Sequence, residues 1–264
     1  TGRSPRLAAH IAEPFVEIHP EDADQRALGD ADLAWLDTSQ GRALVRVLIT
    51  PKARKGAVFV PMHWTTQNGP SGRVNRLVEA VTDPVSGQPA SKGTQVDVQR
   101  AEMAWHGFAV SLNPMSPDTT YSATAPCRRG WRAELAGDVR PEDWEGLARE
   151  VTGWSDAAAA VFEDSRTGAL RMALHENGVI VALFFAAPEP VAVARTYVTG
   201  LLGRDMSPME ALAGRAAADI QTTDSLRAVE FVRRKAQQID LQFVHIHRDS
   251  ANCLRGVGMQ QYAP

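Results

Sequence analysis

The stretch that most limits how this chain can fold lies near its start, at residues 15–23. Phe15-Val16-Glu17-Ile18 is a short, mostly apolar run that leads directly into His19-Pro20-Glu21-Asp22. Proline suits the first position of a helix, and acidic side chains in the first turn interact favourably with the helix dipole. We therefore expect a strand that passes at once into a helix near residues 21–28. His19 is expected to have a structural role at this turn.

Further short strands are expected over residues 32–37, 43–50, 57–61 and 96–98, separated by turns that contain glycine. The run Leu44-Val45-Arg46-Val47-Leu48-Ile49 is rich in β-branched and apolar residues, as a barrel strand can be. Several short strands and one helix in so short a length of chain predict a compact barrel. This first domain is expected to cover residues 1–101.

The second half of the chain has an α+β pattern, and nothing in it assembles a site. Strands are expected at 106–112, 131–135, 157–163, 170–175 and 179–186, and helices at 141–151 and 190–202. Trp144, Leu147, Ala148 and Val151 are spaced to form one apolar stripe on the first helix. Asn177-Gly178 favours a tight hairpin turn. We expect an α+β domain over residues 105–206.

Residues 207–264 are expected to form a helical and irregular tail, with a short helix from Ser207, a helix-like segment at 219–239 and a strand-like run at 241–247. His245 and His247 lie two apart, a spacing that can present two imidazoles to one metal ion. No third ligand is identifiable, so we expect no metal site.

Composition excludes several classes of protein. A formal net charge of −3 gives no electrostatic reason to bind nucleic acid or an anionic membrane, and no apolar run is long enough to span a bilayer. Cys127 and Cys253 are too few for a disulfide framework or an iron–sulfur cluster, and a cytoplasmic setting is expected. The chain contains no Gly-rich dinucleotide fingerprint, P-loop, nucleophile elbow or His-Glu-x-x-His motif. It begins at Thr1 without an initiator methionine, which predicts a fragment or a processed chain.

Polar residues of the first domain are suited to binding a phosphorylated heterocycle. The segment Thr1-Gly2-Arg3-Ser4 combines hydroxyls, a permissive glycine and a guanidinium. Asn75 carries an amide that donates and accepts, and Lys92 supplies a point cation. From composition alone the commoner interpretations are a frayed terminus for residues 1–4, a capping role for Asn75 and a solvated side chain for Lys92. His63, beside Trp64, is either a hydrogen-bonded core residue or a donor near a bound ligand.

The order and spacing of several segments resemble the pterin-dinucleotide-binding domain at the C-terminus of molybdopterin oxidoreductases, most of all the assimilatory nitrate reductases. The segments are Thr1–Ser4, residues 15–23, Val58-Phe59-Val60-Pro61-Met62-His63-Trp64, Asn75-Arg76-Leu77, Asp83-Pro84-Val85-Ser86-Gly87-Gln88-Pro89 and Lys92. The resemblance is clear over the first hundred residues and weaker to about Gly214. It implies a double-psi β-barrel, which agrees with the strand pattern.

The resemblance also implies a cofactor, molybdenum bis(molybdopterin guanine dinucleotide), and a reaction, the two-electron reduction of nitrate to nitrite. Thr1, Gly2, Arg3, Ser4, Asn75 and Lys92 match cofactor-binding positions, and Met62 and His63 match positions near the substrate funnel. The molybdenum ligand and the iron–sulfur clusters belong to parts of the parent enzyme outside this sequence. We therefore expect no catalytic residue in this fragment, which is inactive without the N-terminal catalytic domains and an electron donor.

Two alternatives stay open at this point, together with one question about the tail. The parent is alternatively a formate dehydrogenase or another oxidoreductase of the same superfamily, or the barrel is a non-catalytic binding module. The family continues beyond an equivalent of Gly214 into a cysteine-rich [2Fe-2S] segment that this chain lacks. One hypothesis is that residues 215–264 are out of frame or replaced. Sequencing the source DNA tests it, and the absence of a cysteine-rich pattern in an adjacent frame rejects it.

Overall fold

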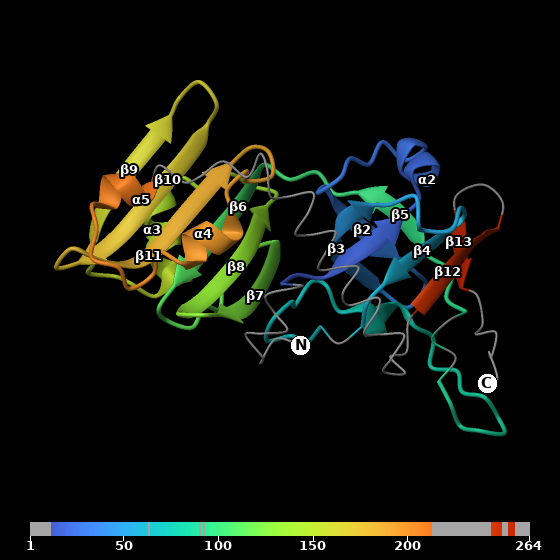
Figure 1. The fold of residues 1–264 in the computed structure, drawn as a ribbon. Coiled ribbons are helices and arrows are strands. Elements are labelled where there is room, and N and C mark those ends of the chain that lie inside the picture. Colours follow the sequence, from blue (N-terminus) through green and yellow to red (C-terminus); the bar gives the residue numbers. More distant parts are fainter. Residues whose placement is uncertain are drawn as a thin grey trace. The chain divides into compact units, whose positions relative to one another are not determined.

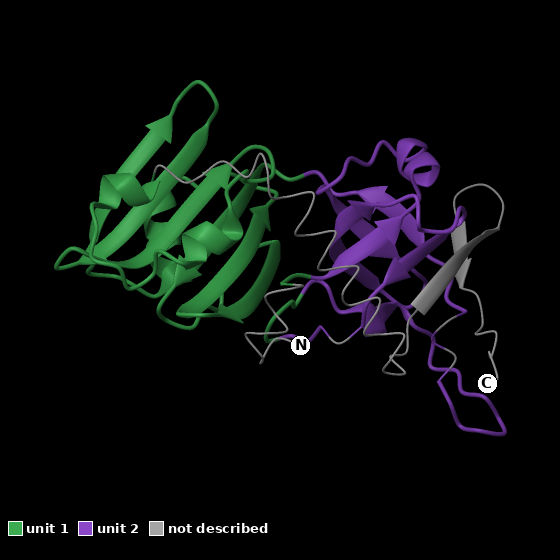
Figure 2. Cartoon of the chain, viewed as in Figure 1, with its two compact units in different colours: residues 1–13, 67–70, 103–239 green, residues 14–66, 71–102, 240–264 purple. Residues whose placement is uncertain are grey.

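The computed structural model describes residues 12–62, 64–89, 91 and 93–212, together with the backbone of residues 244–249 and 253–256. The chain divides into two compact units (Figure 2). Unit 1 contains residues 1–13, 67–70 and 103–239, and unit 2 contains residues 14–66, 71–102 and 240–264. The described part is mostly β with a few short helices, as the sequence predicts. None of its helices has the length and apolar character needed to cross a membrane.

Unit 2 is built on a seven-stranded sheet with the order β13-β12-β4-β1-β3-β2-β5 (Figure 1). Its strands are β1 (Phe15–Ile18), β2 (Leu33–Asp37), β3 (Arg42–Ile49), β4 (Ala57–Val60), β5 (Asp97–Arg100), β12 (Val244–Asp249) and β13 (Cys253–Gly256). β1 runs parallel to β3, and the other pairs are antiparallel. Apolar side chains such as Val16, Leu36 and Val47 form its buried core. The strands expected from the alternation of the sequence are confirmed.

The first helix, α2 (Pro20–Asp24), begins as expected but is shorter than the predicted 21–28. His19 is its N-cap, and its Nδ1 accepts a hydrogen bond from the Glu21 N–H at 3.2 Å. The structural role expected for His19 is confirmed. The helix ends early because the backbone turns into the left-handed region at Ala27, where φ is 50°. This turn lets the Leu28 N–H reach back to the Ala23 carbonyl at 3.0 Å.

Unit 1 is built on a six-stranded antiparallel sheet with the order β7-β8-β6-β11-β10-β9 (Figure 1). Its strands are β6 (Trp105–Ser111), β7 (Tyr121–Cys127), β8 (Gly130–Gly137), β9 (Ala158–Asp164), β10 (Ala169–Glu176) and β11 (Val179–Ala187). β7 is not predicted by the sequence, because small and polar residues and Pro126 hide its alternation. It is the edge strand, and the carbonyl of Asn68 accepts a hydrogen bond from the Thr124 N–H at 2.9 Å.

Helices cover both faces of this sheet. On one face, α3 (Trp144–Thr152) buries Ala148 and Val151, so the predicted apolar stripe is confirmed. Asp143 caps this helix by accepting the Gly146 N–H at 2.8 Å. On the other face lie α4 (Arg195–Thr199) and α5 (Pro208–Leu212). The hairpin between β10 and β11 turns at Asn177-Gly178 with φ values of 50° and 83°, as expected for this dipeptide.

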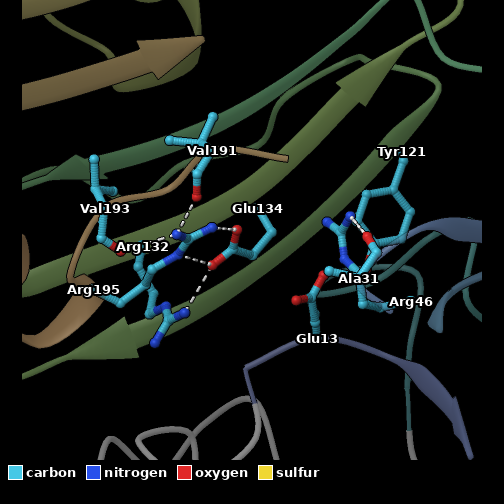
Figure 3. A network of polar contacts seen from close by, with 9 residues as sticks. All are labelled: Glu13, Ala31, Arg46, Tyr121, Arg132, Glu134, Val191, Val193 and Arg195. Carbon is cyan, nitrogen blue, oxygen red and sulfur yellow. Dashed lines mark hydrogen bonds and ion pairs between the residues drawn. The ribbon is translucent and has the colours of Figure 1, made fainter. Parts of the chain in front are cut away.

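The helix expected over residues 190–202 is wrong for most of its length, since only Arg195–Thr199 is helical. The preceding residues run extended, and the carbonyls of Val191 and Val193 accept hydrogen bonds from the Arg195 guanidinium (Figure 3). Arg195 also binds Glu134 on β8. The Arg195 side chain thus donates to carbonyls that would accept from backbone N–H groups in a longer helix. The segment packs on the sheet, with Val191, Val193 and Val198 buried.

The predicted helix-like segment at 219–239 lies outside the described residues. The strand-like run expected at 241–247 overlaps β12, which pairs antiparallel with β4. His245 and His247 lie on β12 as expected for a strand, and their side chains are outside the described part. Among the described residues, no group of His, Cys, Asp or Glu is arranged to hold a metal ion.

Candidate functional site

The chain that carries the polar residues of unit 2 is held tightly against β3 and the segment before β1. The Leu44 N–H donates to the Ser71 carbonyl at 2.8 Å. At Gly72, a Cβ atom would lie 2.2 Å from Cγ of Pro14, which is closer than any real contact. Only glycine, which has no Cβ, leaves room for the Pro14 ring at this position. This contact fixes where the following turn begins.

That turn is a single 3-10 turn, η1 (Val74–Leu77), and it presents Asn75 outward. Val74 and Leu77 are almost fully buried, whereas Asn75 and Arg76 are exposed. The turn is capped at Arg73 without a side-chain hydrogen bond, so Asn75 is not its capping residue. Within the described part of the chain, its amide has no hydrogen-bonding partner. A fixed backbone with a free amide is suited to recognising a ring that both donates and accepts.

The other residues expected at the site are only partly described. Met62 follows β4 and is half-buried next to the buried Trp64. His63, Lys92 and the segment Thr1-Gly2-Arg3-Ser4 lie outside the described residues. The structure therefore positions Met62 and Asn75 within unit 2, and the roles of all these residues stay predictions.

A preformed loop lies between η1 and the strand β5. Oδ1 of Asp83 accepts hydrogen bonds from the N–H groups of Val85 at 3.0 Å and Ser86 at 2.7 Å, and from the Ser86 hydroxyl at 3.0 Å. These bonds, with the Ser86 backbone N–H contributing most, lower the pKa of the Asp83 carboxyl. Gly87 closes the loop with φ at 70°. Figure 1 shows the loop extending away from the sheet of unit 2. Val85, within this loop, is 94% exposed.

A cleft of about 730 Å³ lies within unit 2, between the β2–β3 turn, the end of η1 and the chain leading into β5. Its lining residues are Asp37, Thr38, Ser39, Leu77, Glu79, Val81, Gly93, Thr94, Gln95 and Asp97. Leu77 is two residues from Asn75, and Gly93 directly follows Lys92. The lining is thus continuous in sequence with two of the expected cofactor-binding residues.

The three carboxylates of the cleft have different surroundings. Asp37 forms a two-point ion pair with Arg42, at 3.0 and 3.3 Å, and the Arg42 guanidinium lies over the Trp35 ring. Asp97 accepts a hydrogen bond from the neutral amide of Gln99 at 2.6 Å. Glu79 has no partner among the residues that the structure describes. The cleft therefore offers hydrogen-bond acceptors without a matching positive charge among its described lining residues.

The sequence predicts a glycine-containing turn between the strands at 32–37 and 43–50, but not that this turn forms part of a cleft. Asp37 and Asp97 come together because β2 and β5 are neighbouring strands, in a register that pairs these two residues directly. They are far apart in sequence, and neither forms part of a recognisable motif. The one indication of a cleft in the sequence is the polar run Asp37-Thr38-Ser39, which makes this turn longer than a two-residue glycine turn.

Part of the chain is similar to known protein families. Residues 1–95 match the family model of the molydopterin dinucleotide binding domain. A nitrate reductase of Klebsiella oxytoca is 41% identical over 155 residues, which is 58% of this chain and 18% of the relative. The assimilatory nitrate reductase catalytic subunit of Bacillus subtilis is 35% identical over 92 residues, 35% of this chain and 12% of the relative.

Formate dehydrogenases also match. The F420-dependent formate dehydrogenase 1 subunit alpha of Methanococcus maripaludis is 33% identical over 100 residues, which is 38% of this chain and 14% of the relative. The chain thus spans less than a fifth of the length of these curated relatives. Both kinds of enzyme appear, so the matches do not distinguish nitrate from formate as the substrate.

Residues 1–95 are thus similar to a molydopterin dinucleotide binding domain. The matches support the recognition of the whole as a C-terminal part of a molybdopterin oxidoreductase related to the nitrate reductases. Within the described residues, the Asn75 amide is exposed and has no hydrogen-bonding partner, and an open cleft lies beside η1.

Proposed function

We propose that this chain binds the dinucleotide portion of a molybdenum bis(molybdopterin guanine dinucleotide) cofactor within a nitrate reductase. The observation that carries the proposal is the dinucleotide-binding match over residues 1–95, together with 41% identity to a nitrate reductase over 155 residues. The second match extends beyond the first in length, so it includes more than the cofactor-binding domain alone.

In this proposal, each expected domain of the chain has its own role. Residues 1–101 form the cofactor-binding domain, with a double-psi barrel as its topology, residues 105–206 form a second domain, and residues 207–264 form the tail. Thr1, Gly2, Arg3 and Ser4 bind the dinucleotide, with Asn75 and Lys92, while Met62 or His63 lies near the substrate. Support for Asn75 comes from its fixed backbone and exposed amide.

The cofactor supplies the redox chemistry, which is a two-electron oxygen-atom transfer from nitrate to give nitrite. The side chains of this chain bind and orient the cofactor, and they exclude solvent from part of it. Iron–sulfur centres in other parts of the parent enzyme deliver the electrons. This chain alone is therefore expected to be inactive.

A second candidate substrate is formate, which is favoured by the identity to F420-dependent formate dehydrogenase subunits. The substrate pocket and the metal ligand of such enzymes lie largely outside the region compared. The two candidates differ in the reaction catalysed by the complete parent and not in how this chain binds the dinucleotide.

The decisive experiment uses the purified full-length parent, assayed for nitrite formation with a reduced dye and for formate oxidation with an oxidised dye. We expect molybdenum in the enzyme and nitrite formation. Formate oxidation without nitrite formation would replace nitrate by formate and leave the cofactor assignment intact. An enzyme that contains no molybdenum would contradict the proposal and favour a non-catalytic binding module.

A further inference from the structure

Exposed apolar side chains gather at one edge of unit 1. β9 is the last strand of the six-stranded sheet, and its neighbouring residues Val161 and Phe162 are 45% and 47% exposed. Met209 lies on α5, which packs against β9 and β10 (Figure 1), and it is 58% exposed. Among the described residues, these are three of the six large apolar side chains that are exposed. Such a grouping is typical of an interaction surface.

This edge is apolar on both faces of the sheet. Phe162 is the direct partner of Arg171 on β10, and directly opposite residues point to the same face. Nη1 of Arg171 donates a hydrogen bond to the Leu212 carbonyl of α5 at 2.9 Å, so Phe162 and α5 share one face. Val161 points to the other face, where its partner on β10 is the buried Met172.

The two edges of this sheet are protected differently. At the β7 edge, Pro126 has no N–H to donate, and the Thr124 N–H donates to the Asn68 carbonyl at 2.9 Å. On β9, residues 158–162 contain neither a proline nor a charge. Within the described part of the chain, no strand pairs with the outer side of β9. An uncharged strand with unpaired N–H and C=O groups is a template for the addition of another strand.

The side chains of β9 are complementary to those of a second β9. Val161 is the middle residue of the seven in Ala158–Asp164. Two copies paired antiparallel over the full strand therefore place Val161 opposite its own counterpart, which continues the apolar row that begins at Met172. The same register places Phe162 opposite Ala160 of the other copy. A large side chain then meets a small one on each side of the twofold axis.

The same register keeps like charges apart. Glu163 lies opposite Ala159 of the other copy, and Asp164 lies opposite Ala158, so the two acidic residues do not face each other. Asp164 is also held by its own turn, since its Oδ1 accepts a hydrogen bond from the Arg166 N–H at 3.0 Å. A twofold axis through Val161 gives a closed pair rather than an open fibre.

We propose that the outer edge of β9 pairs with β9 of a second copy of this chain, antiparallel and centred on Val161. The two six-stranded sheets then become one continuous sheet, and unit 1 is the part of the chain through which two copies associate. This inference concerns unit 1 and does not depend on the proposed cofactor-binding function.

The first test is the mass of the 264-residue chain in solution, measured by sedimentation equilibrium over a range of concentrations. We expect a reversible dimer. Val161→Lys places two ammonium groups at the twofold axis and is expected to weaken the dimer about 100-fold or more. Val139→Lys, the same substitution at a valine of unit 1 that is 74% exposed, is the matched control and should dimerise as the unmodified chain does.

A mixture of two variants tests the twofold contact itself. Val161→Lys and Val161→Glu are each expected to be monomeric, because each repels its own copy. Mixed together, they place opposite charges at the axis, and we expect them to form a heterodimer. Circular dichroism confirms that each variant is folded. A mixture that stays monomeric overturns the proposal, and so does a Val161→Lys chain that dimerises as tightly as the unmodified one.

Disulfide cross-linking tests the register, with Cys127 and Cys253 replaced by serine. Directly opposite residues have Cα atoms about 4.5–5.5 Å apart, which suits a disulfide, so Val161→Cys should cross-link two chains under oxidation. Two copies of Glu163 would be four residues out of register, about 13 Å apart, and Glu163→Cys should not cross-link. Equal cross-linking at both positions overturns the proposal. An unmodified chain that is monomeric at every concentration also overturns it, and leaves this edge for another part of the parent enzyme.

Discussion

Arg195 and Glu134 form a two-point ion pair inside unit 1. Nη2 of Arg195 lies 3.0 Å from Oε2 of Glu134, and its Nε lies 3.2 Å from Oε1 (Figure 3). Glu134 is 3% exposed and also accepts a hydrogen bond from Arg132 at 2.8 Å. Arg195 lies over the Phe108 ring and donates to the Val193 carbonyl. One guanidinium thus joins β8 to the extended segment before α4.

Replacement of Arg195 is expected to be strongly destabilising. In Arg195→Ala the buried Glu134 loses a two-point partner, and the carbonyls of Val191 and Val193 each lose a donor. Removing one partner of a buried pair costs about 3 kcal/mol or more of unfolding free energy. Urea unfolding, followed by tryptophan fluorescence, measures the change. Arg128→Ala, at an exposed position on the same unit, should change stability by less than about 0.5 kcal/mol. Equal effects of the two substitutions would show that the ion pair is not important for stability.

Gly72→Ala is expected to destabilise unit 2, because its Cβ would clash with Cγ of Pro14 at 2.2 Å. Relieving this overlap requires backbone movement, at a cost of about 1–3 kcal/mol. The matched control is Gly93→Ala, since no heavy atom lies within 4 Å of the added Cβ there. Thermal unfolding of the two variants provides the comparison. The packing at Gly72 is not as described if both variants unfold at the same temperature.

Asp97→Asn is expected to stabilise the chain. Removing one of two like charges across β2 and β5 relieves a repulsion worth about 0.2–1 kcal/mol. Asp37→Asn is the informative control, because it relieves the same repulsion but breaks the ion pair with Arg42. Chemical denaturation of both variants should show a gain only for Asp97→Asn. A loss of stability in this variant would mean that Asp97 has a structural role instead.

The loop at Asp83 gives a prediction about pH. Its carboxylate is held by the Ser86 and Val85 N–H groups and the Ser86 hydroxyl, so its pKa in the folded chain lies below its usual value. A depressed pKa means that the loop is stabilised at pH values above the unfolded pKa of about 3.9 and loses this contribution as the pH falls through the lower folded value. NMR titration of the Asp83 carboxyl carbon measures this pKa in the unmodified chain and in Ser86→Ala. The substitution removes the hydroxyl donor and should move the pKa upward. A midpoint that is the same in both proteins would contradict this account.

Much of the fold was predictable because it depends on local patterns. The strand at residues 15–18, the structural role of His19 at the turn that follows and the Asn177-Gly178 hairpin depend on neighbours in sequence. The structure confirms each of them. The apolar stripe of α3 depends on a helical period and is equally visible. A helix with a regular apolar repeat, or a hairpin with a characteristic turn dipeptide, can therefore be predicted from the sequence alone.

The features that were not predicted depend on distant contacts. The edge strand β7 has little apolar alternation of its own and is formed by pairing with β8. The short length of α4 follows from the binding of Arg195 to Glu134, 61 residues away. The cleft follows from the pairing of β2 with β5, which brings Asp37 and Asp97 together. In each case a tertiary partner determines the local structure, and nothing within a short window of sequence indicates that partner.

The most direct test of the central claim is the guanine nucleotide content of the full-length parent. Acid hydrolysis of the cofactor cleaves its diphosphate and releases guanosine monophosphate, which is quantified by chromatography beside molybdenum on the same sample. If this chain binds the bis-dinucleotide form, the parent should release guanosine monophosphate in about twofold excess over molybdenum. Asn75→Ala should reduce the content of guanosine monophosphate and of molybdenum. Asn113→Ala in unit 1 should leave the two contents unchanged. A parent that contains neither molybdenum nor guanine nucleotide would contradict the account.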